Sequence, residues 1–143
     1  MKMFPALEKK YTREQLRILE AQRLAHQIAF APVIFQVSRL MVKFGIFQLL
    51  SDTKGGLTME EVVEKTKLSR YAVQVLLESS LTIGTVLYEN ERFVTSKTGW
   101  LLLTDPLVGV NLRFNHDVTY LGMYNMEEAL LNDKPEEIGR AHV

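Results

Sequence analysis

The sequence contains no cysteine among its 143 residues. Without a thiol, the chain has no disulfide scaffold, no thiolate zinc site and no cysteine nucleophile. The absence is typical of a protein kept in a reducing compartment, and we expect a cytoplasmic location. The three histidines, His26, His116 and His142, do not have the spacing of metal ligands, so no metal ion is expected.

An excess of charge of either sign is also lacking, because 17 Lys and Arg residues balance 17 Asp and Glu residues. Non-specific binding to nucleic acid depends on a basic surface that releases counterions from the phosphates. We therefore expect no nucleic-acid partner.

A long uninterrupted apolar run is missing too. The apolar segment at residues 28–50 is interrupted by Pro32, Arg39 and Lys43, whereas a membrane-spanning helix needs about 20 mostly apolar residues. The segment is interpreted as buried helices, with Gly45 marking either a break between two of them or a close helix crossing. No membrane association is expected.

Recognised catalytic motifs are absent as well. Gly55-Gly56 lacks the third glycine and the preceding strand of a phosphate loop, and no Gly-x-Ser-x-Gly nucleophile elbow occurs. The acidic residues Glu60 and Glu61 are neighbours in sequence, which do not face each other on a helix. The sequence predicts no catalytic residue and no cofactor-binding residue, and we expect no activity from this chain alone.

What the sequence does contain is the order of elements of a winged helix-turn-helix, over residues 57–103. Thr58 followed by Glu61 is a capping box, which predicts the start of a short helix. Ser69 is expected to cap a second helix, whose apolar residues recur at helical spacing. Gly84 is expected to end that helix.

A hairpin is predicted after the second helix. Residues 85–88 and 93–95 are predicted to be strands, joined by a four-residue turn at 89–92. Ser96 is expected to cap a further short helix. Trp100 within that helix is expected to pack the hairpin against the core.

Helical segments precede and follow the winged helix. Thr12 and Gln15 have the pattern of another capping box, which predicts a helix over residues 13–29. Residues 107–132 are predicted to be helical, with a bend near His116. Both segments carry more apolar residues than one narrow face can hold, and the simplest cover is a second copy of the chain across a two-fold axis. We expect a homodimer whose interface includes Leu24, Ile28, Phe30, Ile34, Phe35 and Met41.

The predicted fold class is mainly α with a small β-hairpin, in which a winged helix-turn-helix is combined with N-terminal and C-terminal dimerisation helices. We divide the chain into an N-terminal helical dimerisation arm (residues 1–29), a winged-helix domain (30–106) and a helical linker or dimerisation region (107–134). Residues 137–143 look like an in-frame translation of a sequencing adapter and are interpreted as a non-native tail.

A winged-helix DNA-binding transcriptional regulator is an alternative function, because the second helix would present Arg70 and Gln74 to base edges. The charges oppose this alternative. Glu78 is expected on the same face, and the hairpin turn carries Glu89 and Glu91 where a phosphate-contacting wing would be basic. A stand-alone dimeric adaptor is a third interpretation.

Several segments, taken in order, resemble a known family. Their spacing over about residues 30–132 is similar to that of the N-terminal dimerisation domain of class I O-methyltransferases. The segments are Phe44-Gly45-Ile46-Phe47, Leu57-Thr58-Met59-Glu60-Glu61, Leu76-Leu77-Glu78, Thr95-Ser96-Lys97-Thr98-Gly99 and Asn115-His116-Asp117-Val118.

The resemblance implies the dimerisation and substrate-capping domain of a methyltransferase. In that family a separate C-terminal Rossmann-like domain binds S-adenosylmethionine, while the N-terminal domain dimerises and helps to wall the acceptor pocket. This sequence has no strand followed by a Gly-rich turn and an acidic residue, so residues 107–134 would lead to a missing catalytic domain. The full-length protein would use S-adenosylmethionine and a small-molecule methyl acceptor. By position in the family, the pocket wall would include Phe114, His116, Tyr120 and Met123.

Overall fold

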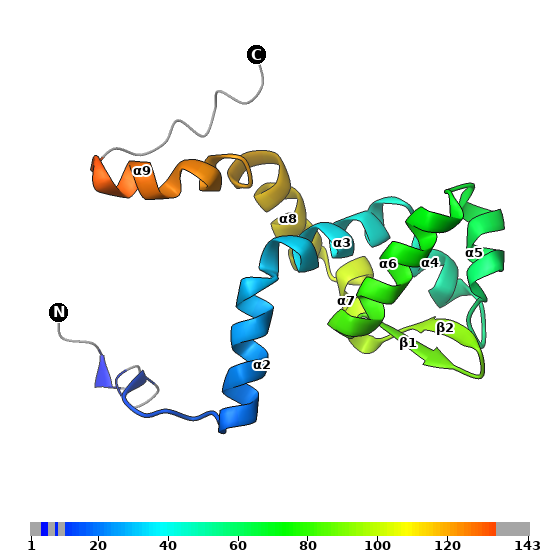
Figure 1. The fold of residues 1–143 in the computed structure, drawn as a ribbon, viewed down its shortest axis with the longest axis horizontal. Coiled ribbons are helices and arrows are strands. Elements are labelled where there is room, and N and C mark those ends of the chain that lie inside the picture. The colour runs from blue at the N-terminus through cyan, green and yellow to red at the C-terminus, as the bar shows by residue number, and fades with distance from the viewer. Residues whose placement is uncertain (1–3, 6–7, 9–10, 134–143) are drawn as a thin grey trace, which may run out of the picture. The chain divides into compact units, whose positions relative to one another are not determined.

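The computed structural model describes residues 4, 5, 8 and 11–133. The expected tail at residues 137–143 lies outside this part of the chain. The chain divides into two compact units, Met1–Phe35 and Gln36–Val143. It is mainly helical with a two-stranded antiparallel sheet, so the predicted fold class is confirmed (Figure 1).

The first unit contains α2, which spans Ile18–Ala29. The helix starts later than the pattern at Thr12 predicts, so that expectation is wrong. The carboxylate of Glu20 accepts a hydrogen bond from the backbone N–H of Arg17 at 2.8 Å, which satisfies one of the amides that a helix start leaves unpaired. No side chain of α2 is buried within the chain.

Helices α3 (Ala31–Lys43) and α4 (Ile46–Asp52) follow. Gly45 separates them with a φ of 73°, in the left-handed region that glycine adopts without a steric penalty. The predicted break at Gly45 is confirmed. No single described helix is long and apolar enough to cross a membrane, and α3 and α4 meet that test only as a pair bent by 60°.

The helix-turn-helix consists of α5 (Met59–Thr66) and α6 (Arg70–Ile83). Thr58 caps α5, and Ser69 caps α6 by accepting from the Ala72 N–H at 3.1 Å. Gly84 ends α6 in the left-handed conformation. The predicted caps and the predicted end are confirmed.

The hairpin consists of β1 (Val86–Glu89) and β2 (Arg92–Thr95), and its turn contains two residues rather than the four expected. Asn90 and Glu91 both have positive φ, 50° and 62°. Two consecutive left-handed residues are typical of the tight turn whose twist matches that of the flanking strands. The strands therefore extend one residue further at the turn on each side.

The core lies in the second unit and is formed by side chains of α3, α4, α5, α6 and the hairpin. Backbone hydrogen bonds between Leu57 and Phe93, 3.0 and 2.8 Å long, join the segment before α5 to β2. The buried apolar side chains are Val37, Met41, Ile46, Phe47, Leu50, Leu57, Val62, Val73, Leu76, Leu77, Val86 and Phe93.

Helices α7 (Lys97–Thr104) and α8 (Pro106–Phe114) continue the chain. Ser96 caps α7 as predicted, and its side chain accepts from the Gly99 N–H at 3.2 Å. The expectation that Trp100 packs the hairpin against the core is wrong, because its side chain is 52% exposed. The residue of α7 that is buried is Gly99.

The last described segment bends as predicted near His116. A π-helical turn, η1 (Asn115–Thr119), is followed by a 3-10 turn, η2 (Gly122–Asn125), and by α9 (Met126–Leu131). None of these elements has a buried residue.

Candidate functional site

The outer face of α6 carries a chain of polar contacts. The guanidinium of Arg70 lies 3.2 Å from a carboxylate oxygen of Glu60 on α5 and 3.4 Å from the amide oxygen of Gln74. Gln74 in turn donates to Glu78 at 2.8 Å. The side chains that a DNA-reading helix would offer to bases are therefore held by carboxylates of the same domain.

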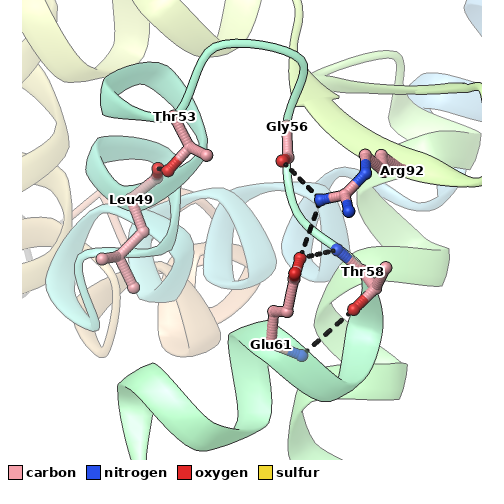
Figure 2. Close-up of polar contacts among 6 residues, drawn as sticks. All are labelled: Leu49, Thr53, Gly56, Thr58, Glu61 and Arg92. Atoms are coloured by element: carbon pink, nitrogen blue, oxygen red, sulfur yellow. Dashed lines mark hydrogen bonds and ion pairs between the residues drawn. The ribbon is translucent and has the colours of Figure 1, made fainter.

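The hairpin is tied to the start of α5 by Arg92 (Figure 2). Its Nη1 atom lies 2.9 Å from Oε2 of Glu61 and donates to the carbonyl oxygen of Gly56 at 3.2 Å. The same Glu61 oxygen accepts from the Thr58 N–H at 2.8 Å. The backbone hydrogen bond from Thr58 and the charge of Arg92 both hold the pKa of Glu61 below its ordinary value.

These contacts reduce the positive charge that the winged helix could offer to phosphate. Arg70 and Arg92 both face carboxylates, and Glu89 and Glu91 lie at the hairpin tip. A wing that contacts DNA needs cations free to displace phosphate counterions. The arrangement favours a structural role for the winged helix.

The residues predicted at the dimer interface fall into three groups. Leu24, Ile28 and Phe30 are exposed, while Ile34 and Phe35 are half-buried. Met41 is completely buried in the core of the chain and has no surface left for a second copy. The apolar spacing in the sequence does not distinguish the end of α3 that faces the core from the start of α3 that is exposed. Met41 is therefore left out of the proposed interface.

Further exposed apolar side chains lie outside the predicted interface. On α7 and α8 they include Trp100, Leu107 and Val110, all more than half exposed. The sequence signal for them is that residues 107–114 are apolar on several sides of one helix.

The four residues predicted at the pocket wall lie around the π turn. His116 and Tyr120 are half-buried, and their ring centroids are 6.4 Å apart. Phe114 and Met123 are exposed. A shallow hollow on the described surface is lined by other residues, namely Tyr124, Asn125, Glu127, Glu128, Leu131 and Asn132. The role of the four predicted residues at a substrate pocket stays a prediction.

The π turn itself is defined by hydrogen bonds of Asn115. Its carbonyl oxygen accepts from the Tyr120 N–H at 2.8 Å, a spacing of five residues, and from the Thr119 hydroxyl at 3.1 Å. Its side chain donates to the Asn111 carbonyl at 2.9 Å. A π turn inserts one residue into a helix and is frequent at functional sites.

Gln36 of α3 contacts the π turn, and Arg39 of the same helix contacts Gln36. Gln36 places its amide nitrogen 3.4 Å from Nδ1 of His116, and its amide oxygen accepts from Arg39 Nε at 3.0 Å. Gln36 and Arg39 are not among the residues predicted from the sequence to form a site. No local signal identifies the contact, because Gln36 and His116 are 80 positions apart.

The described residues offer no group of three acidic or histidine side chains that could hold a metal ion. They do not fit S-adenosylmethionine either. A Rossmann-like domain binds its cofactor at the carboxyl ends of parallel strands, whereas β1 and β2 are antiparallel. No cofactor chemistry is therefore assigned to the described part of the chain.

The winged helix pairs Arg70 and Arg92 with its own carboxylates, and the same chain carries exposed apolar helices, a surface that usually marks an interaction site. The comparison with family models agrees. Residues 22–93, half of the chain, match the Dimerisation2-like domain. The chain belongs to this family.

Solved structures share the fold. The S-adenosylmethionine-dependent methyltransferase SibL, in its apo form, matches 75% of this chain with a TM-score of 0.65 and 21% identity. Human N-acetylserotonin methyltransferase in complex with SAM matches 85% of it, with a TM-score of 0.64 and 18% identity. A protein described as a pericyclic reaction enzyme matches 91%, with a TM-score of 0.67 and 16% identity. At these identities the likeness establishes the fold.

The chain spans about a third of the length of these proteins, 32% of SibL, 32% of the pericyclic enzyme and 36% of the human methyltransferase. The comparison with curated proteins found no match. The chain thus has the family and the fold of a dimerisation domain found in S-adenosylmethionine-dependent methyltransferases.

Proposed function

We propose that this chain is the dimerisation and substrate-capping domain of an S-adenosylmethionine-dependent methyltransferase, and that it forms a homodimer. The observation that carries the proposal is the match to a dimerisation family combined with helices that bury nothing. The proposed division is a dimerisation arm at residues 1–29, a winged helix at 30–106 and a linker or dimerisation region at 107–134. The proposed location is the cytoplasm.

The first helix supports the dimer. Ile18, Leu24 and Ile28 lie toward one side of α2 and are between 45% and 83% exposed. Large contiguous apolar surfaces on a soluble chain usually mark an interaction site. Complete burial of one such side chain against a partner contributes about 1.5–3 kcal/mol, and burial of several of them on both copies would offset the cost of association, about 4–15 kcal/mol.

Analytical ultracentrifugation of the 143-residue chain tests the dimer. We expect a wild-type dimer, and a dissociation constant at least about tenfold higher for Ile28→Asp, because a buried charge without a partner is unfavourable. Tyr71→Asp is the matched control. Tyr71 is 78% exposed on α6, outside the proposed interface, and its substitution should leave the dimer intact. A wild-type chain that stays monomeric at every concentration would contradict the proposal.

In the proposed enzyme this domain orients the methyl acceptor and excludes water, while a second domain holds S-adenosylmethionine. Methyl transfer is a displacement that depends mainly on proximity and orientation. The candidate wall residues are Phe114, His116, Tyr120 and Met123, and the acceptor is a small molecule.

The proposal that the full-length protein is a methyltransferase is tested by sequencing the gene beyond the codon for Glu137. A long sequencing read through the codon for Glu137 should show a frame that continues into a strand, a Gly-rich turn and an acidic residue about 20 positions on. The protein made from that frame should bind S-adenosylmethionine and transfer its methyl group. A stop codon directly after Val143, or cofactor binding without methyl transfer to any acceptor tested, would overturn the methyltransferase proposal and leave the dimer standing.

A further inference from the structure

Three side chains form a continuous hydrogen-bonded chain that ends at the π turn. Arg39 and Gln36 are three positions apart on α3, on the same face of the helix. Arg39 Nε donates to the amide oxygen of Gln36 at 3.0 Å, and the amide nitrogen of Gln36 lies 3.4 Å from Nδ1 of His116. The second distance is at the long end of the hydrogen-bond range.

The chemistry of these groups fixes the direction of the chain. A guanidinium only donates, so the atom of Gln36 that faces Arg39 is the amide oxygen. The amide nitrogen, which also only donates, then faces His116. Nδ1 of a neutral His116 must therefore accept, and the ring hydrogen must be on Nε2.

Arg39 makes this orientation stable. Its side chain is half-buried, and among the described residues its one hydrogen bond goes to Gln36, with no carboxylate within ion-pair distance. Rotating the Gln36 amide would bring two donors together at Arg39 and leave that cation without a partner.

We propose that Arg39 and Gln36 are positioning residues that hold neutral His116 as the Nε2–H tautomer, so that His116 offers the substrate a hydrogen-bond donor and not a base. The proposal rests on the proposed function for the location of His116 at the substrate pocket. Nε2 of His116 has no hydrogen-bond partner among the described residues. The group that it binds is an oxygen acceptor on the methyl-accepting substrate, such as a carbonyl, ether or phenolate oxygen.

The tautomer is measured by long-range ¹H–¹⁵N NMR of the 143-residue chain labelled at histidine, at a pH where the imidazoles are neutral. The wild type should show an unprotonated Nδ1 and a protonated Nε2 at His116. Gln36→Glu should reverse this, because a carboxylate accepts from Nδ1–H, and Arg39→Met should give a mixture of tautomers. His26 on the exposed α2 is the internal reference. A His116 that carries its hydrogen on Nδ1, or a tautomer that neither substitution changes, would overturn the proposal.

The role of His116 toward the substrate is tested by enzyme kinetics. These use the protein encoded by the reading frame that continues past Glu137, which is expected to bind S-adenosylmethionine. His116→Leu should raise KM about two- to tenfold, the usual effect of one lost hydrogen bond. His116→Gln retains a donor and should restore most of this loss. If His116 were the base, Gln would be as inactive as Leu in kcat, and the donor role would be wrong. Absence of any methyl transfer would instead contradict the proposed function, while the NMR result on the 143-residue chain would stand.

Discussion

Arg92 on the hairpin and Glu61 in the first turn of α5 lie 2.9 Å apart, and they join two elements that are 31 positions apart in the sequence. Glu61 also accepts from the Thr58 N–H. One carboxylate therefore starts a helix and anchors the hairpin at the same time.

This double role predicts a stability that depends on pH. The pKa of Glu61 is lowered from its ordinary value of 4.5, first by the backbone hydrogen bond from Thr58 and also by Arg92. A lowered pKa in the folded state means that the unfolded chain binds the proton more readily. The contribution is therefore complete above the ordinary value and is lost as the pH falls through the folded value.

Glu61→Gln should therefore lower the melting temperature at neutral pH, and the difference from wild type should shrink below about pH 4.5. Thermal unfolding followed by circular dichroism across this range measures it. Glu64→Gln on the same helix, where the exposed carboxylate has no described hydrogen bond, is the control. If the melting temperatures of wild type and Glu61→Gln fall in parallel as the pH is lowered, the stabilising role of the Glu61 carboxylate is refuted.

Two neighbouring glycines predict very different tolerance to alanine. Gly55 and Gly56 both have positive φ, 83° and 79°, but a Cβ on Gly55 would meet open space. A Cβ on Gly56 would collide with the carbonyl oxygen of Phe93 and with the side chain of Val94. Gly55→Ala should cost only the left-handed strain of about 1–2 kcal/mol. Gly56→Ala should cost about 1–3 kcal/mol more from overpacking. Urea denaturation of both variants measures the difference. Equal losses in the free energy of unfolding would contradict the close approach of Gly56 to the Phe93 carbonyl oxygen.

A buried hydroxyl predicts a substitution that does no harm. Ser80 Oγ is completely buried and has no hydrogen-bond partner within the described part of the chain. Ser80→Ala removes an unsatisfied polar group, so the free energy of unfolding should stay the same or rise by about 1 kcal/mol. Thr85 is the matched comparison, because its buried hydroxyl donates to the Ser80 carbonyl at 3.3 Å.

Thr85→Val should lower the free energy of unfolding by about 0.5–1.5 kcal/mol, the usual value for one hydrogen bond. Chemical denaturation of the two single variants compares them directly. A loss at Ser80→Ala as large as that at Thr85→Val would show that the Ser80 hydroxyl has a partner after all.

The charge arrangement predicts that the chain does not bind duplex DNA. Arg70 faces Glu60, and the whole chain has no net charge. Fluorescence anisotropy with a labelled duplex at about 50 mM salt, where phosphate contacts are strong, should show no binding. Binding that weakens with salt and is abolished by Arg70→Ala would instead favour the transcriptional regulator.

The caps were predictable because each one acts within a few residues. Thr58 with Glu61, Ser69 and Gly84 all define helix ends as expected. Thr12 has the same kind of pattern but fails, because Glu20 binds the amide of Arg17 and the helix begins there. A capping pattern is sufficient only where no better cap follows it.

Tertiary contacts were harder to predict. Met41 and Trp100 are both apolar residues on helices, yet Met41 is buried and Trp100 is half exposed. Which side of a helix faces the core depends on elements far away in sequence. The contact between Gln36 and His116 has the same origin. Only the position of His116 near a bend could be predicted.

Helix α2 has a consequence for the whole protein. It contains twelve residues and buries none of them, and a helix of this length is only marginally stable in water by itself. If the second copy supplies the missing contacts, helix formation and association are thermodynamically linked. The helical content of the chain would then follow the law of mass action and rise with protein concentration.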